Sequence, residues 1–145
     1  MRKLIGTLVM AGLATAGALV ASSPAQAIPP NQFCELFVLS VTADDVLNDG
    51  GSDAVFVKPG QFQPVNTVDM FVGQTKPASA FGNPSDTFVP PATMPLSVFV
   101  KLGSSSKQVG ATAKIGCTVV TGASRTFTDG DATYRVKYTV IKEIV

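Results

Sequence analysis

An acid-rich stretch between two predicted strands carries the residues best able to hold a metal ion. Thr42–Lys58 reads TADDVLNDGGSDAVFVK, with oxygen-bearing side chains at Asp44, Asp45, Asn48, Asp49 and Asp53. Calcium takes roughly six to eight oxygen ligands, and the Gly-Gly pair within the stretch lets the backbone wrap around an ion, so the composition favours Ca²⁺. The alternative is a solvated turn, because the same residues build exposed connections and their spacing does not match the regular helix-loop-helix calcium pattern.

Catalysis has few candidate residues in this chain. There is no histidine, which excludes Ser-His-Asp and Cys-His chemistry and the usual zinc sites. A carboxylate pair drawn from the acidic stretch, or the Ser104–Lys107 run SSSK, could act as acid and base or as nucleophile and amine. Nothing in the sequence shows the desolvation that either arrangement needs. We therefore expect a non-enzymatic protein, with a small secreted carboxylate-based hydrolase as the alternative.

The first residues have the pattern of a secretory signal peptide. Met1–Ala27 combines a basic start, an apolar middle and the small-residue end Ala-Gln-Ala. A membrane anchor is the alternative, but the apolar run is near the lower length limit for a spanning helix and is rich in Gly, Ala and Thr. We expect cleavage before Ile28, which leaves 118 of the 145 residues as one secreted domain, 28–145, that is not embedded in a membrane.

Charge and cysteine content narrow the partners and the compartment. The expected mature chain has nine Lys and Arg against ten Asp and Glu, with no basic cluster, which argues against nucleic acid and against anionic membranes. Its two cysteines, Cys34 and Cys117, form an even count in an exported chain and predict one intramolecular disulfide. Two buried free thiols are the alternative.

Short β-strands separated by Gly and Pro account for most of the mature chain. Alternation is clearest in Leu96–Leu102 and Ala132–Ile144, where apolar residues recur at every second position. The other expected strands are Phe33–Thr42, Ala54–Lys58, Val68–Val72, Thr87–Val89, Val109–Ile115 and Cys117–Thr121, with 73–86 as a connecting loop and Asp129-Gly130-Asp131 as a hairpin turn. This pattern predicts an all-β, antiparallel β-sandwich of about seven to eight strands.

The order of these segments resembles a known family. The acidic ADDVLNDGGSDAVFVK, the strand LSVFVKL followed by VGATAKI, and the closing FTDGDATYRVKYTV are similar to the calcium- and lipid-binding β-sandwich named after the second conserved region of protein kinase C, in the form found in small secreted bacterial proteins. The resemblance implies a calcium site at the acidic loop. In calcium-binding members the tip after the LSVFVKL-like strand also supplies carboxylates, whereas here that tip, 103–107, is GSSSK. The calcium site implied by the resemblance is therefore degenerate.

Two phenylalanines are candidates for a contact patch. Phe99 lies on the polar side of its alternating strand, so either other residues cover that face or Phe99 is exposed to a partner. Phe81 lies in the expected connecting loop, with filling of the sandwich end as its alternative. Taken together, the sequence favours a secreted binding module for an extracellular protein or surface ligand, monomeric or weakly oligomeric. A self-associating cell-surface protein that uses exposed sheet edges is a further alternative.

Overall fold

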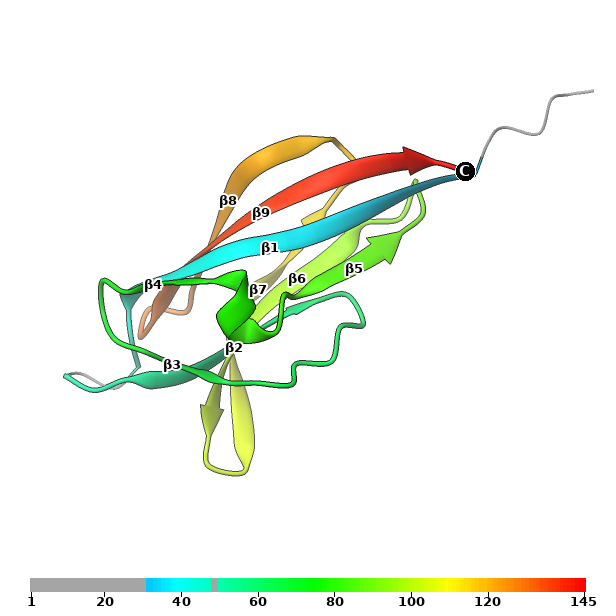
Figure 1. Cartoon of the computed structure of the whole chain (residues 1–145). Helices are drawn as coiled ribbons and strands as arrows, with labels where there is room; N and C mark the ends of the chain where they lie inside the picture. Colours follow the sequence, from blue (N-terminus) through cyan, green and yellow to red (C-terminus); the bar gives the residue numbers. More distant parts are fainter. Residues whose placement is uncertain (1–30, 48–49) are drawn as a thin grey trace, which may run out of the picture.

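Two antiparallel sheets form a β-sandwich around one hydrophobic core (Figure 1). The structure is a computed structural model that describes residues 31–47 and 50–145. The predicted signal segment, Met1–Ala27, lies outside the described residues. Within the described ranges there are nine strands, so the predicted all-β sandwich is confirmed, with slightly more strands than the seven to eight expected.

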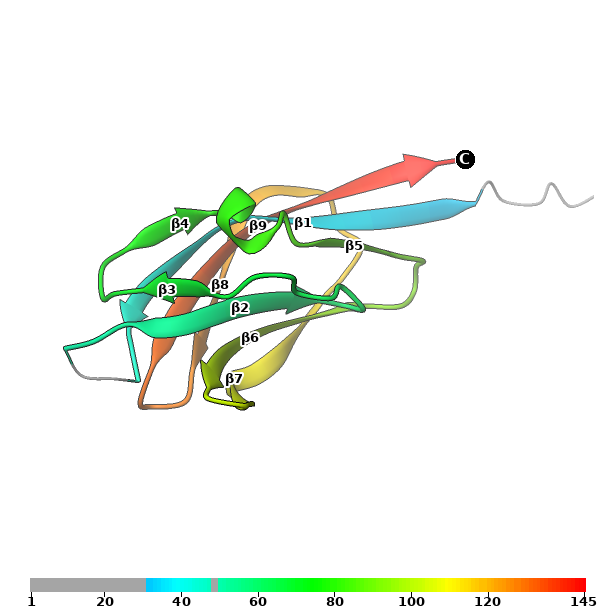
Figure 2. The ribbon, with the colours of Figure 1, turned by 60° about the horizontal axis from the view of Figure 1, so that its bottom comes forward.

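The first sheet is built on the two longest strands, β1 (Gln32–Asp45) and β9 (Thr133–Ile144). They pair antiparallel from Gln32 opposite Ile144 to Asp45 opposite Thr133. The far side of β9 pairs with β8 (Val120–Thr128). The other side of β1 is shared by two short strands, β4 (Thr75–Pro77) and β5 (Ser85–Phe88), which pair with different parts of it. A single 3₁₀ turn, η1 (Ala78–Phe81), lies between β4 and β5 (Figure 2).

The second sheet has the order β3-β2-β6-β7. Its strands are β3 (Val68–Met70), β2 (Asp53–Pro59), β6 (Met94–Leu102) and β7 (Ser105–Ile115). β6 and β7 form the hairpin that projects from the body of the sandwich in Figure 1. The two-residue period predicted for β6 is observed, because its inward side chains Leu96, Val98 and Val100 are almost completely buried.

The predicted disulfide joins Cys34 and Cys117, whose Cα atoms are 5.7 Å apart. Cys34 lies in β1 of the first sheet, and Cys117 lies in the connection that leaves β7 of the second sheet. The bond therefore ties the two sheets together across a sequence separation of 83 residues.

Two parts of the strand assignment were wrong. Residues 73–86, expected as a loop, contain β4, η1 and the start of β5. The strand expected at Cys117–Thr121 is instead β8, which begins at Val120 and continues to Thr128. β8 shows no apolar alternation because Phe127 is its only buried residue. Within the described residues, no helix has the length and apolar character needed to cross a membrane.

Candidate functional site

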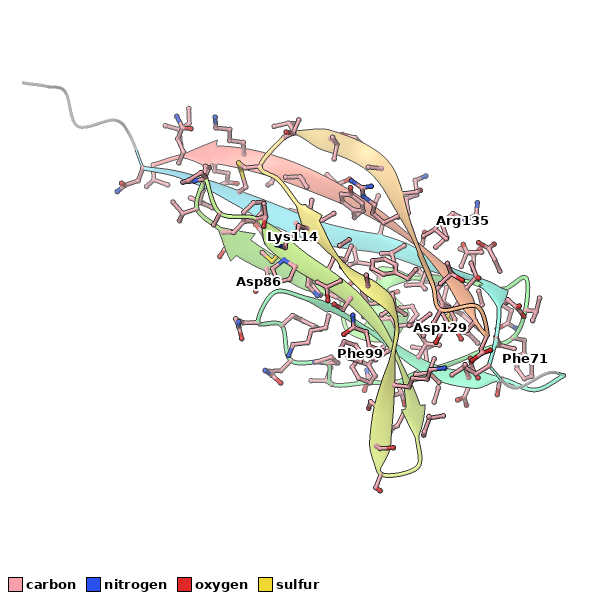
Figure 3. All side chains as sticks on the ribbon, turned by 180° about the vertical axis from the view of Figure 1, so that it is seen from behind. Phe71, Asp86, Phe99, Lys114, Asp129 and Arg135 are labelled. Atoms are coloured by element: carbon pink, nitrogen blue, oxygen red, sulfur yellow. A yellow bond between two sulfur atoms is a disulfide. The ribbon has the colours of Figure 1, made fainter. Side chains whose placement is uncertain are left out.

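The acidic loop begins where β1 ends, and its first carboxylate is bound to an arginine. Asp44 is an exposed residue near the end of β1, and Arg135, near the start of β9 (Figure 3), is the register partner of Thr42, two residues earlier in β1. The guanidinium Nη2 lies 2.5 Å from Asp44 Oδ1, and Nε donates to Oδ2 at 3.2 Å. Both carboxylate oxygens of Asp44 therefore accept hydrogen bonds from the same cation, in the two-pronged geometry that suits Arg and a carboxylate.

Asp53 differs from the expectation for a solvated loop residue, because its side chain is buried. It is the first residue of β2 and only 4% exposed. Its Oδ2 accepts a hydrogen bond from the Leu47 amide at 2.7 Å and another from the hydroxyl of Tyr134. Tyr134 is fully buried, and burial together with the neighbouring Asp53 carboxylate raises the pKa of its phenol well above the usual range. Together with the Asp44–Arg135 pair, the Tyr134–Asp53 bond anchors both ends of the acidic loop to β9.

The predicted calcium ligands are thus divided among different local contacts. Asp45 Oδ1 accepts from the amide of the next residue, Val46, at 2.9 Å. Asn48 and Asp49 lie outside the described residues. Among the residues that the structure describes, no three His, Cys, Asp or Glu side chains gather closely enough to hold a metal. The described carboxylates do not fit Ca²⁺ as they stand, because Asp44 would first have to leave Arg135. Calcium binding at this loop stays a prediction from the sequence, and the contacts of Asp44 and Asp53 argue against it.

A second acidic turn is bound by a lysine. Asp129-Gly130-Asp131 forms the β8–β9 hairpin turn, as the sequence indicated. Lys107 of β7 reaches this turn, with its Nζ 2.8 Å from Asp129 Oδ2 and 3.4 Å from Asp131 Oδ2. The hydrogen bond from Lys107 holds the pKa of the Asp129 carboxyl below its usual range. Lys107, the cation in the carboxylate-free tip 103–107, therefore joins the β6–β7 hairpin to the β8–β9 hairpin.

The two candidate contact residues have opposite environments. Phe81 is 1% exposed and belongs to the core, so its assignment to a contact patch was wrong and the alternative, that it fills the interior, holds. Phe99 is half-buried on the outer face of β6. Its ring stacks on that of Phe56, its register partner on β2, with centroids 5.0 Å apart and planes 7° from parallel. Phe99 therefore forms one half of an aromatic pair on the outer face.

This aromatic pair lines a groove of about 510 Å³ on the outer face of the second sheet. One wall comes from strand residues and the other from the irregular segment that leads from β2 to β3. The lining residues are Phe56, Lys58, Gln63, Pro64, Val65, Asn66, Thr67, Phe99, Lys101 and Ser106. This volume falls within the range of about 300 to 1,000 Å³ typical of small-molecule sites. The groove is therefore large enough for a drug-sized molecule.

The segment that forms the non-strand wall of the groove makes a few contacts outside the groove. The amide of Gln61 donates to Asp86 Oδ2 at 2.6 Å, and the amide of Phe62 donates to the Pro59 carbonyl at 2.9 Å. Val65 lies against Gly82, where a Cβ would come within 2.9 Å of Val65 Cγ2. Gly82 also has a φ of 81°, which disfavours any residue with a side chain. These contacts hold the start of the segment at Gln61 and Phe62, whereas Val65 in the wall itself is 75% exposed.

Sequence reasoning identified Phe99 but missed its neighbours in the groove. The alternation of Ala54–Lys58 already places Phe56 and Lys58 on one side of their strand, opposite the buried valines. What the pattern could not give is the register of β2 on β6, which sets Phe56 opposite Phe99.

Comparison with known proteins assigns no family. No protein-family model matches the chain, and no curated protein is significantly similar to it. Functional inference therefore rests on the geometry of the groove and of the acidic loop.

Proposed function

We propose that this protein is an exported, non-enzymatic binding module that holds its ligand in the groove on the outer face of the second sheet. The observation that carries the proposal is the stacked pair of Phe56 and Phe99, half-buried in the groove. Aromatic side chains contribute a large apolar area and a defined geometry to binding. A flat apolar group in the groove would extend this stack.

The lining supports binding over catalysis. It contains no carboxylate, cysteine or histidine, and of its hydroxyl and amine groups only Ser106 and Lys101 lie directly opposite each other on neighbouring strands. These two residues are register partners on β6 and β7, yet no hydrogen bond joins their side chains among the described residues. The hydroxyl therefore lacks the activation that a nucleophile requires.

A neutral fluorescent probe tests the proposal. N-phenyl-1-naphthylamine is apolar, flat and uncharged, and its emission rises on transfer from water to an apolar site. We expect it to bind the purified protein, and we expect Phe99→Ala to weaken its affinity about tenfold, which is about 1.4 kcal/mol. The matched control is Phe71→Ala, because Phe71 is 49% exposed on the connection between β3 and β4, away from the groove lining. Equal affinity of both variants would place the probe elsewhere and contradict the proposal.

A further inference from the structure

We infer that the ligand of the groove is an elongated, flat apolar molecule that carries an anionic group at each end; this inference rests on the proposed function. Three features of the outer face lead to it: the position of two lysines relative to the aromatic pair, the absence of acids from the lining, and the size of the groove. Each concerns residues outside the core and outside the connection between β1 and β2.

The two lysines of the groove flank the aromatic pair from opposite sides. In the antiparallel register of β2 and β6, Lys58 lies opposite Ser97 and Phe56 opposite Phe99, while Lys101 lies opposite Ala54. Lys58 is thus two residues from the stack in one direction, and Lys101 is two residues from it in the other. At about 3.4 Å per residue, their Cα atoms are roughly 14 Å apart along the strands. A single small anion at the stack would not occupy both lysines.

No acid of the groove lining competes for these ammonium groups. The lining contains two lysines, three side-chain amide or hydroxyl residues from the non-strand wall, and Ser106, but no Asp or Glu. Within the part of the chain that the structure describes, neither Lys58 nor Lys101 forms a salt bridge. Asp69 of β3 is the register partner of Ala54 on the edge of β2 away from β6, and it forms no salt bridge with Lys101. The charge of the groove is therefore positive at both ends, which complements an anion at each end of the ligand.

The shape of the groove favours a small molecule over an acidic peptide. The wall formed by residues 63–67 bounds the groove on one side, and the volume of about 510 Å³ is that of a single drug-sized ligand. Of the two edge strands of the second sheet, where a peptide strand could be added, β3 is only three residues long and β7 contributes only Ser106 to the groove lining. An acidic peptide is therefore an alternative to be tested, not the occupant that we propose.

A matched set of stilbenes tests the charge requirement. Stilbene-4,4′-dicarboxylate, the 4-monocarboxylate and the neutral 4,4′-dicarboxamide share one flat body and differ in the number of anionic ends. We expect the dicarboxylate to bind the purified protein at least about tenfold more tightly than the dicarboxamide, with the monocarboxylate between them. We also expect this preference to shrink in 1 M salt, because exposed charges are screened over about 3 Å there.

Lysine variants locate the charges. Lys58→Gln and Lys101→Gln should each weaken the dicarboxylate about three- to fivefold, a size typical of exposed ion pairs, and weaken the uncharged dicarboxamide less. Lys114→Gln is the control: Lys114 pairs with Pro95 near the other end of β6 and is not part of the lining (Figure 3). If all three substitutions weakened the dicarboxylate equally, the effect would reflect only the net charge of the protein, and the inference would be overturned.

The outcomes separate this inference from the proposed function. If the neutral naphthylamine binds in a Phe99-dependent way but the dicarboxylate has no advantage over the dicarboxamide, the groove is a binding site and the inferred ligand class is wrong. If neither probe depends on Phe99, the proposed function itself fails. If an acidic decapeptide displaces the dicarboxylate at a lower concentration than the monocarboxylate does, the occupant is a protein segment and the small-molecule inference is overturned.

Discussion

Replacing Tyr134 by phenylalanine removes one hydroxyl from the interior and takes a hydrogen-bond donor away from a buried carboxylate. Tyr134 is fully buried, Asp53 is 4% exposed, and the hydroxyl donates to Asp53 Oδ2. A hydrogen bond to a charged group contributes about 1.5 to 3 kcal/mol to stability. The Leu47 amide continues to donate to the same oxygen, so the carboxylate keeps one partner. We therefore expect Y134F to lower the free energy of unfolding by about 2 kcal/mol, or Tm by roughly 10 °C.

The matched control is the same substitution at Tyr138. Tyr138 lies on the same face of β9 and is 5% exposed, but among the described residues no hydrogen bond from its hydroxyl is present. Urea unfolding of both variants measures the difference directly, and Y138F should change stability by less than about 0.5 kcal/mol. Combining Y134F with Asp53→Asn should cost less than the two separate losses, because both changes remove the same bond.

The alkaline limb of the stability curve gives an independent measure. Burial and Asp53 raise the pKa of Tyr134 in the folded protein above the value of about 10 in an unfolded chain. The folded state therefore binds the phenol proton more tightly, so this stabilisation is fully present below about pH 10 and is lost as pH rises beyond it. In Y134F the free energy of unfolding should fall less steeply above about pH 10, whereas Y138F should show the same fall as the unmodified protein. Similar stability losses and similar alkaline slopes in both variants would refute the role assigned to the Asp53–Tyr134 bond.

Two further predictions concern the disulfide and calcium. The double substitution of Cys34 and Cys117 by serine should lower the free energy of unfolding by about 4.5 kcal/mol, since the bond closes a separation of 83 residues. Reduction of the unmodified protein should lower its urea midpoint for the same reason, and an unchanged midpoint would contradict this. Calcium at about 5 mM should leave Tm of the unmodified protein within about 1 °C of its value in chelator, because Arg135 and Tyr134 already bind Asp44 and Asp53. A calcium-induced rise of several degrees, lost in Asp49→Asn, would instead establish the site predicted from sequence.

Alternation in the sequence was a reliable guide where one face of a strand meets the core. β6 and β9 were located well because apolar residues recur at every second position and most of these are buried, among them Leu96, Val98 and Val100 of β6. β8 lacks this signal, since Phe127 is its only buried residue and the strand is held mainly by its ladder to β9. β4 is three residues long and pairs with β1 only at Ser40–Thr42, so nothing local distinguishes it from a loop.

The site residues were harder to predict because their roles depend on long-range contacts. Asp53 was read as a candidate calcium ligand, or else as part of a solvated turn, yet its partner Tyr134 is 81 residues away and the carboxylate is buried. The pattern placed Phe99 on the polar side of its strand, but its partner Phe56 lies on another strand, brought opposite by the register of the sheet. The sequence thus singled out Asp53 and Phe99, but their contacts depend on long-range pairings that only the folded chain shows.

The distribution of charge is the strongest reason to place recognition at the groove instead of the acidic loop. Asp44 is neutralised by Arg135, and the turn at Asp129 is neutralised by Lys107, so much of the acidic charge is already compensated within the fold. In the groove the situation is reversed, because Lys58 and Lys101 flank an apolar pair without a salt-bridge partner among the described residues. Charges paired within a protein offer little further energy to a ligand, since the ligand must first displace the internal partner. Unpaired cations beside a stacked aromatic pair present no such competitor, so an anionic ligand gains more free energy there.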